Sequence, residues 1–133
     1  MNRVMDRAAR RAAEWDCCQT VQAFYAALDD KRYEDLAALF APDGVWNRLG
    51  KDLVGPAAIL AAMQTRNDWV TAHVLTNLAV TLDGEGTAHT RQYVTLYRHE
   101  GVSAEAGPLP VVLPLAILRH RDVLVPVDGK WLF

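Results

Sequence analysis

Apolar side chains recur every three to four residues at the start of the chain, which is the spacing of one buried helical face. The pattern predicts a long helix over residues 3–29. Its apolar stripe consists of Ala13, Cys17, Val21, Phe24 and Leu28. A helix with a stripe of this length is expected to pack along a sheet or another helix for most of its length.

Two shorter helices are predicted next, with two short strands between them. The first restarts after Asp30, whose carboxylate can cap it, and ends at the turn residues 41–44. Residues 45–55 alternate around Gly50 as two short strands, with Trp46 and Arg48 on one face. The third helix begins at Pro56, because the missing N–H of proline has no helical partner in a first turn.

From residue 70 onward the alternation has the period of two that is typical of β-strands. Residues 70–82 and 87–99 flank the sequence DGEG, which predicts a hairpin with Gly86 in the left-handed position that closes a three-residue loop. A Pro- and Gly-rich stretch over 104–114 precedes a long strand to about Val125, a DG turn and a last short strand. Helices followed by antiparallel strands predict an α+β fold.

Composition and charge are those of an ordinary globular protein. The chain has 133 residues, 51% of them hydrophobic and 23% charged, which suits a single domain over 1–133. A net charge of -2 gives no long-range attraction to nucleic acid or to an anionic membrane. No stretch approaches the roughly 18 apolar residues of a membrane span. The adjacent Cys17 and Cys18 cannot bridge without strain, so reduced thiols and a cytoplasmic protein are expected.

The hairpin register decides which side chains share a face with His73. With a three-residue loop, Asn77 lies opposite Tyr93 and His73 lies opposite Tyr97. One face then carries His73, Asn77, Arg91, Tyr93 and Tyr97. A two-residue loop would place Gln92 beside Asn77 instead. Either face of the first strand can be the one that packs on the long helix.

Four segments, residues 21–46, 55–59, 71–101 and 120–131, follow one another in an order and spacing that resemble the SnoaL-like branch of the nuclear transport factor 2-like superfamily. This branch is related to scytalone dehydratase and ketosteroid isomerase. The resemblance runs from about residue 16 to residue 133. It implies a cone, in which a strongly bent antiparallel sheet wraps around the long N-terminal helix and encloses a pocket for a small molecule.

The resemblance also implies which strand face lines the cone. The odd-numbered side chains of residues 71–81, including His73 and Asn77, are expected to face the pocket. The even-numbered side chains would form the outer face; the apolar ones are Val70, Val74, Leu78, Val80 and Leu82. An apolar outer face needs a cover, so a homodimer through this face is expected.

Enzymes of this superfamily mostly catalyse proton transfers, and His73 is the residue that best fits such chemistry. Isomerase-like members use an Asp on the early strand and a Tyr on the first helix, which match Arg48 and Phe24 here, with Tyr25 next to Phe24. These departures argue against the isomerase mechanism. Dehydratases use two histidines and an acid on the first helix. His73 matches one histidine, while Tyr93 falls near the second and the acid falls near Ala26.

His73 and Tyr93 are therefore the predicted catalytic residues, since a histidine with a reference pKa of about 6.5 exchanges protons near neutral pH. The predicted ligand-binding residues are Trp46, Arg48, Asn77, Arg91, Tyr97, Tyr25 and Phe24. No cofactor and no metal are expected, because the histidines lack metal-ligand spacing with acids or thiols. Two other functions stay open: a non-catalytic binding protein with the same pocket, and a structural domain that uses its sheet to dimerise.

Overall fold

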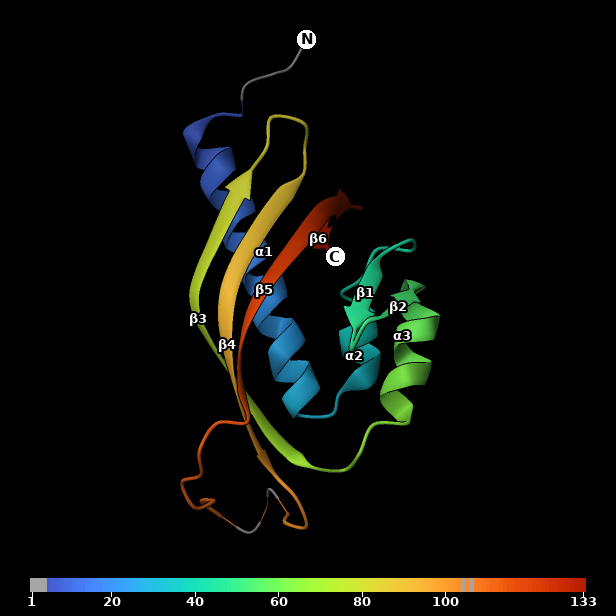
Figure 1. Cartoon of the computed structure of the whole chain (residues 1–133). Coiled ribbons are helices and arrows are strands. Elements are labelled where there is room, and N and C mark those ends of the chain that lie inside the picture. Colours follow the sequence, from blue (N-terminus) through green and yellow to red (C-terminus); the bar gives the residue numbers. More distant parts are fainter. Residues whose placement is uncertain (1–4, 104, 106) are drawn as a thin grey trace.

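A long helix lies against a strongly curved antiparallel sheet, and two shorter helices with a small hairpin complete the fold (Figure 1). The computed structural model describes residues 5–103, 105 and 107–133. The helices are α1 (Arg7–Asp29), α2 (Tyr33–Ala37) and α3 (Gly55–Gln64). The strands are β1 (Val45–Arg48), β2 (Lys51–Val54), β3 (Val70–Leu82), β4 (Ala88–His99), β5 (Ala116–Val127) and β6 (Lys130–Leu132).

Helix α1 begins at Arg7 because the carboxylate of Asp6 accepts a hydrogen bond from the backbone N–H of Ala9 at 2.8 Å. The predicted apolar stripe of α1 is buried, and Tyr25 and Ala27 are buried with it. The first residues of the predicted helix, 3 and 4, lie outside the described residues. No helix of the described chain has the length and apolarity needed to cross a membrane.

The break after α1 differs from the prediction. Asp30 does not cap α2; it is the C-cap of α1, and its backbone N–H donates to the carbonyl of Ala26 at 2.9 Å. Lys31 follows in the left-handed region with φ 59°, in the turn between α1 and α2. The N-cap of α2 is Arg32, whose side chain makes no capping hydrogen bond with a described residue.

The sheet has the order β3-β4-β5-β6, and β1 pairs with β2 in a separate hairpin. Three hydrogen bonds hold the last strand around the helices. The hydroxyl of Thr20 donates to the carbonyl of Trp131 at 2.7 Å. The backbone N–H of Phe133 donates to Leu39 at 2.9 Å, and that of Ala41 donates to Phe133 at 2.6 Å. The curled sheet thus forms a half-barrel around α1, which is the α+β cone that the sequence predicts.

The β3–β4 hairpin closes with the predicted three-residue loop. Leu82 pairs with Ala88, and Gly86 has φ +86°. The Asp83 carboxylate accepts hydrogen bonds from the backbone N–H groups of Thr87 (3.0 Å) and Glu85 (2.9 Å). These bonds to Thr87 and Glu85 favour the ionised carboxylate and lower the pKa of Asp83.

A β-bulge at Asn77 divides β3 into two halves. Odd-numbered side chains face the core before the bulge, and even-numbered side chains face it after the bulge. Thr76 pairs with Tyr93, but the next pair is Ala79 with Arg91, so two residues of β3 face one residue of β4. Asn77 itself has φ 54°, a left-handed conformation that asparagine tolerates better than most residues. Because side chains alternate, one extra residue reverses the faces of everything beyond it.

The bulge overturns part of the predicted lining. Thr71, His73 and Leu75 do face α1, as expected for odd-numbered positions. Beyond the bulge the even-numbered side chains face the core, and the predicted outer position of three of them is wrong. These three are Leu78, Val80 and Leu82. Asn77 is exposed and does not face the cone.

The same shift corrects the predicted partners of His73. His73 pairs with Leu96 and not with Tyr97. On β4 the buried positions are the even-numbered Ala88, Thr90, Gln92 and Val94. Arg91 and Tyr93 alternate with them and are exposed on the outer face. The predicted polar face that combined His73 with Arg91, Tyr93 and Tyr97 therefore does not form.

Candidate functional site

Asp29 and His73 form a hydrogen-bonded pair between the last residue of α1 and the first half of β3. His73 Nδ1 lies 2.5 Å from Asp29 Oδ1, and the backbone N–H of His73 donates to Asp29 Oδ2 at 2.8 Å. The hydroxyl of Thr71 donates to Asp29 Oδ1 at 2.9 Å. The His73 and Asp29 side chains are only 10% and 22% exposed, so this carboxylate is largely buried and lies within reach of three donors.

This arrangement sets the direction of the hydrogen bond at the imidazole ring. A carboxylate that already accepts two other donors acts as an acceptor, so Nδ1 of His73 carries the proton. The other ring nitrogen, Nε2, has no hydrogen-bond partner among the described residues. Every fully buried side-chain nitrogen and oxygen of those residues does have a partner, so Nε2 is not fully buried. Nε2 is therefore open to solvent or to a ligand. An imidazole oriented this way by a carboxylate is suited to exchange a proton at Nε2.

Tyr25, one turn before Asp29 on α1, lies beside the His73 ring. The two rings stack with centroids 5.7 Å apart, and the rings of His120 on β5 and Tyr25 are nearly perpendicular with centroids 6.3 Å apart. Gln92 Nε2 is 3.5 Å from the Tyr25 hydroxyl, to which it can only donate. Burial raises the pKa of Tyr25 to about 12. The hydroxyl therefore stays protonated at neutral pH and keeps a proton to donate.

The raised pKa of Tyr25 predicts a loss of stability in strong alkali. An unfolded tyrosine ionises near pH 10 and the folded one near 12, so the stabilising effect is complete below pH 10 and disappears as the pH rises to 12. The shift corresponds to roughly 2–3 kcal/mol. Urea unfolding between pH 9 and 12 should show this decline in the wild type and not in Tyr25→Phe. Tyr93→Phe, on the outer face, is the control and should retain it; equal curves for wild type and Tyr25→Phe would contradict the prediction.

A second polar cluster faces the cone from β4 and β5. The register places Thr90 opposite Asp122 and Gln92 opposite His120. Asp122 Oδ2 accepts hydrogen bonds from Gln92 Nε2 at 2.6 Å and from Thr90 Oγ1 at 2.9 Å. Its other oxygen, Oδ1, has no partner among the described residues. Since every fully buried side-chain oxygen of those residues has a partner, Oδ1 is accessible.

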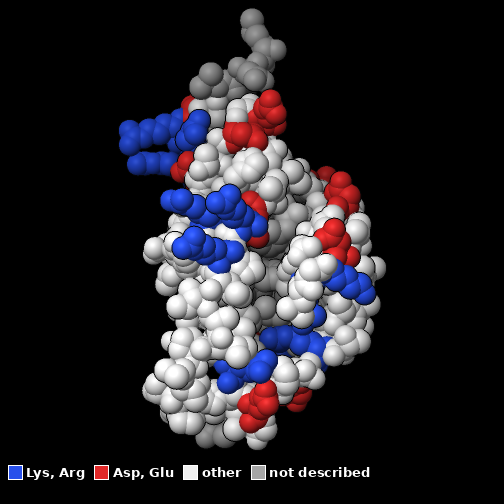
Figure 2. Space-filling model, viewed as in Figure 1, with Lys and Arg blue, Asp and Glu red and all other residues white. Residues whose placement is uncertain are grey.

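An aromatic wall is built around Phe24, whose ring centroid lies 5.0 Å from that of Tyr25. Phe24 contacts Trp46, Phe40 and Phe133 with ring centroids 5.2 to 6.1 Å apart. The Arg48 guanidinium lies 5.8 Å from the Trp46 ring centroid, where a cation–π contact is favourable. Figure 2 shows a hollow between the sheet and the part of the molecule that holds β1, β2 and α3, with basic side chains at its lower end.

Among the predicted site residues, Tyr25 stacks on His73, whereas Trp46 and Arg48 contact each other beside Phe24, which is a core residue. Asn77, Arg91, Tyr93 and Tyr97 do not join them. The sequence pattern did not indicate four further functional candidates, Asp29, Gln92, His120 and Asp122. Asp29 left one signal, because an acid in the last turn of a helix opposes the helix dipole and here has no basic residue beside it in that turn.

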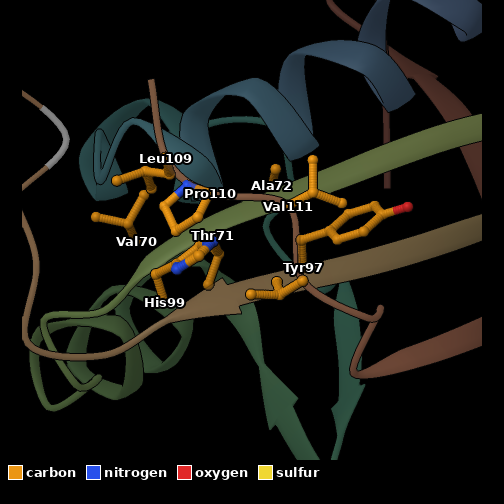
Figure 3. A pocket seen from close by; sticks show the side chains of 9 residues that line it. Val70, Thr71, Ala72, Tyr97, His99, Leu109, Pro110 and Val111 are labelled. Carbon is orange, nitrogen blue, oxygen red and sulfur yellow. The ribbon is translucent and has the colours of Figure 1, made fainter. Parts of the chain in front are cut away.

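Tyr97 instead lines a hollow of about 330 Å³ on the outer face of the sheet. Figure 3 shows it between β3, the end of β4 and the loop that carries Leu109, Pro110 and Val111. Its walls are mostly apolar, and His99 lies on the same face. This hollow is separated from His73 by the sheet itself, since Ala72 and Tyr97 point away from α1.

No three or more His, Cys, Asp or Glu side chains within residues 5–103, 105 and 107–133 gather closely enough to hold a metal ion. The polar groups that face the cone are instead suited to hydrogen bonding and proton exchange with an organic ligand.

Solved structures share this architecture over most of the chain. Aln2 from a Streptomyces species is 24% identical, with a TM-score of 0.72 over 88% of this chain and 82% of that one. A protein from Catenulispora acidiphila, solved in complex with S-DNPA, is 24% identical, with a TM-score of 0.71 over 95% of this chain and 89% of that one. ActVI-ORFA from Streptomyces coelicolor is 20% identical, with a TM-score of 0.67 over 88% of each chain. At these identities the likeness establishes the fold.

No curated protein is similar enough to the chain to count as a match. The family comparison is more informative, because the SnoaL-like domain matches residues 9–133, which is nearly the whole sequence. Its extent agrees with the order of elements from α1 to β6. The chain therefore belongs to the family of SnoaL-like domains.

Proposed function

We propose that this protein is a cofactor-independent isomerase, cyclase or dehydratase that acts on a small carbonyl compound, with His73 as its general acid and base. The observation that carries the proposal is the Asp29–His73 pair, which leaves Nε2 of His73 open. Nε2 takes a proton from the carbon next to the substrate carbonyl and returns it at another position. Asp29 holds the ring in place throughout, because its Oδ1 lies 2.5 Å from Nδ1 and can accept the hydrogen bond of this nitrogen at every stage.

The adjacent Tyr25 supplies the second group that such a reaction needs. Removing a proton beside a carbonyl places negative charge on the oxygen, and a neutral hydroxyl in a dry site stabilises that charge by donating a hydrogen bond. Tyr25 is 6% exposed and, with its pKa raised to about 12, keeps its proton. Its ring stacks on His73, which supports a role for both groups on one substrate.

The polar groups also narrow the class of ligand. The Tyr25 hydroxyl can donate a hydrogen bond to a ligand, and Asp122 Oδ1 can accept one. The two residues are neighbours, because Gln92 Nε2 donates both to the Tyr25 hydroxyl at 3.5 Å and to Asp122 Oδ2 at 2.6 Å. A ligand that complements them carries a carbonyl next to a hydroxyl group. The aromatic wall with Trp46 suits a flat molecule. The Catenulispora acidiphila protein, which shares this fold, was solved in complex with S-DNPA, and this supports a ligand site in the fold.

Proton exchange tests the proposal without knowledge of the natural product. An aryl methyl ketone with a neighbouring phenol, such as 2-acetyl-1-naphthol, is incubated in D₂O, and loss of its methyl protons is followed by NMR. We expect His73→Asn to slow the enzyme-dependent exchange by roughly 100-fold, the lower end of the effect of a general base. Asparagine keeps a donor near Asp29 but cannot accept a proton at the position of Nε2.

The matched control is His99→Asn, which removes a histidine on the outer face and should leave exchange unchanged. If the ketone binds but the wild type does not accelerate exchange, the protein is a small-molecule-binding protein. If His99→Asn slows exchange and His73→Asn does not, the outer hollow is the site.

A homodimer through the outer face of the sheet is the second part of the proposal. This face exposes several large apolar side chains, among them Val74 (45%), Tyr93 (37%) and Ile117 (68%). Val74 and Ile117 lie on either side of Thr95 in one row of the sheet, and Tyr93 lies in the next row. Large apolar side chains gathered on one exposed face are often covered by a partner. A second copy supplies the same surface by a two-fold axis.

Ile117→Glu tests the dimer, because a charge on the outer face would have to be buried without a partner. The wild type is expected to sediment as a dimer in analytical ultracentrifugation, and the variant as a folded monomer. Trp15→Glu, an exposed change on α1, should leave the dimer intact. A monomeric wild type at micromolar concentration would contradict this part of the proposal.

A further inference from the structure

We infer that Arg66 is the positioning residue of the Asp29–His73 pair and acts on it through the hydroxyl of Thr71. The catalytic half of this inference rests on the proposed function, whereas the hydrogen-bond half can be measured without any substrate.

Arg66 lies in the segment between α3 and β3 and joins three elements. Its Nη1 donates to the carbonyl of Leu28 on α1 at 3.2 Å and to the hydroxyl of Tyr33 on α2 at 3.3 Å. Its Nη2 donates to Thr71 Oγ1 on β3 at 3.1 Å. The side chain is half-buried, so the planar guanidinium fixes the end of α1 relative to the start of β3.

The hydrogen bonds run in one direction from Arg66 to His73. A guanidinium can only donate, so Thr71 Oγ1 accepts from it and has its single proton left for Asp29 Oδ1, 2.9 Å away. Asp29 Oδ1 then accepts from both Thr71 and His73 Nδ1. Thr71 is 8% exposed, which leaves little room for water to replace its hydroxyl. Without Arg66, the hydroxyl of Thr71 is free to rotate away from the carboxylate.

Arg66 also compensates negative charge at the C-terminal end of α1. The Asp29 carboxylate lies at the negative end of the helix dipole, and the last turn carries no basic residue. Arg66 brings a positive charge to this point from outside the helix and bonds the carbonyl of Leu28, which also accepts from the backbone N–H of Lys31 at 3.4 Å. The guanidinium of Arg66 therefore offsets the negative charge of both the helix end and the carboxylate, and it acts on Asp29 without a direct hydrogen bond.

The experiment measures exchange of the His73 Nδ1 proton with water by NMR in the full chain without ligand. Arg66→Met and Thr71→Val should each accelerate this exchange by about tenfold, the effect expected when one hydrogen bond to a charged group is lost. The double variant should show no further acceleration, because both changes remove the same interaction. Arg32→Met is the matched control, since this neighbouring arginine pairs only with the exposed Asp30 and Asp35 among the described residues.

Three outcomes would overturn the inference: unchanged exchange in Arg66→Met, multiplied effects in the double variant, or an equal acceleration in Arg32→Met. Thr71→Val tests the same relay even where Arg66→Met does not fold, and Thr71→Ser should restore slow exchange because it keeps the hydroxyl. In the proton-exchange assay, Arg66→Met should lower kcat and leave KM unchanged, since Arg66 does not touch the ligand. Slow Nδ1 exchange with no catalysis in the wild type would refute the proposed enzyme and leave the role of Arg66 intact.

Discussion

Replacing Asp29 with alanine is expected to lower the free energy of unfolding by about 2–4 kcal/mol. The change removes the acceptor of three hydrogen bonds, from Thr71 Oγ1 and from the backbone and ring nitrogens of His73. Each intramolecular hydrogen bond contributes about 1 kcal/mol, and a buried donor without an acceptor adds a further penalty. Loss of a carboxylate from a helix C-terminus returns roughly 0.3–1 kcal/mol, which is too little to offset this. Urea unfolding at pH 7 measures the difference.

The neighbouring Asp30 provides the control for Asp29. Its side chain is 63% exposed and pairs with Arg32 at 3.5 Å, a surface contact worth at most about 1 kcal/mol. Asp30→Ala should therefore unfold nearly like the wild type. The free energy of unfolding of Asp29→Asn should lie between those of Asp29→Ala and Asp30→Ala. The amide oxygen still accepts a hydrogen bond, but the amide NH₂ group faces the donors of Thr71 and His73. Equal stabilities of Asp29→Ala and Asp30→Ala would mean that the pair with His73 contributes nothing to the fold.

Phe24→Ala is expected to have the largest effect on stability, about 3–5 kcal/mol, the range for deleting a buried aromatic side chain. The Phe24 ring is 8% exposed and contacts four other rings edge-on, Tyr25 at 5.0 Å, Trp46 at 5.2 Å, Phe133 at 5.6 Å and Phe40 at 6.1 Å. Its loss leaves a cavity between α1, β1 and the last residues of the chain. For a protein of this length, the melting temperature should fall by roughly 10–20 °C.

Trp15→Ala, in the same helix, separates this effect from a change in helix propensity. Trp15 is 65% exposed, and its removal should shift the melting temperature by only a degree or two. The comparison also decides between two roles of Phe24, which the sequence predicts as a ligand-binding residue and the structure places in the core. A stable Phe24→Ala variant with weakened ligand binding would favour the first role.

The helices and the three-residue hairpin loop could be predicted because their signals are local. The apolar stripe of α1 and the positive φ of Gly86 each follow from a few neighbouring residues. The bulge at Asn77 could not be predicted in this way. Its only local mark is an asparagine with φ 54°, and asparagine also occurs in regular strands. Misplacing this one residue was enough to assign Arg91, Tyr93 and Tyr97 to the wrong face.

The candidate site was predictable only in part for a related reason. His73 stood out because a histidine inside an apolar strand is unusual, and the resemblance to SnoaL-like proteins gave it a role. Its partner Asp29 is 44 residues away in the sequence, and the resemblance placed the acid near Ala26, about one turn earlier on the helix. Asp122 and Gln92 bond each other across two strands, and only the sheet register shows that they meet.

The bulge in β3 selects which side chains the far half of this strand presents to the core. Deleting Asn77 would restore unbroken alternation and leave Leu78, Val80 and Leu82 facing inward, because Leu78 would then follow Thr76 directly. A strand of the present length without the bulge would instead turn Asn77, Ala79 and Thr81 inward and replace the apolar wall by small and polar side chains. The same residues can therefore build two different interiors beyond His73, and the bulge selects the apolar one.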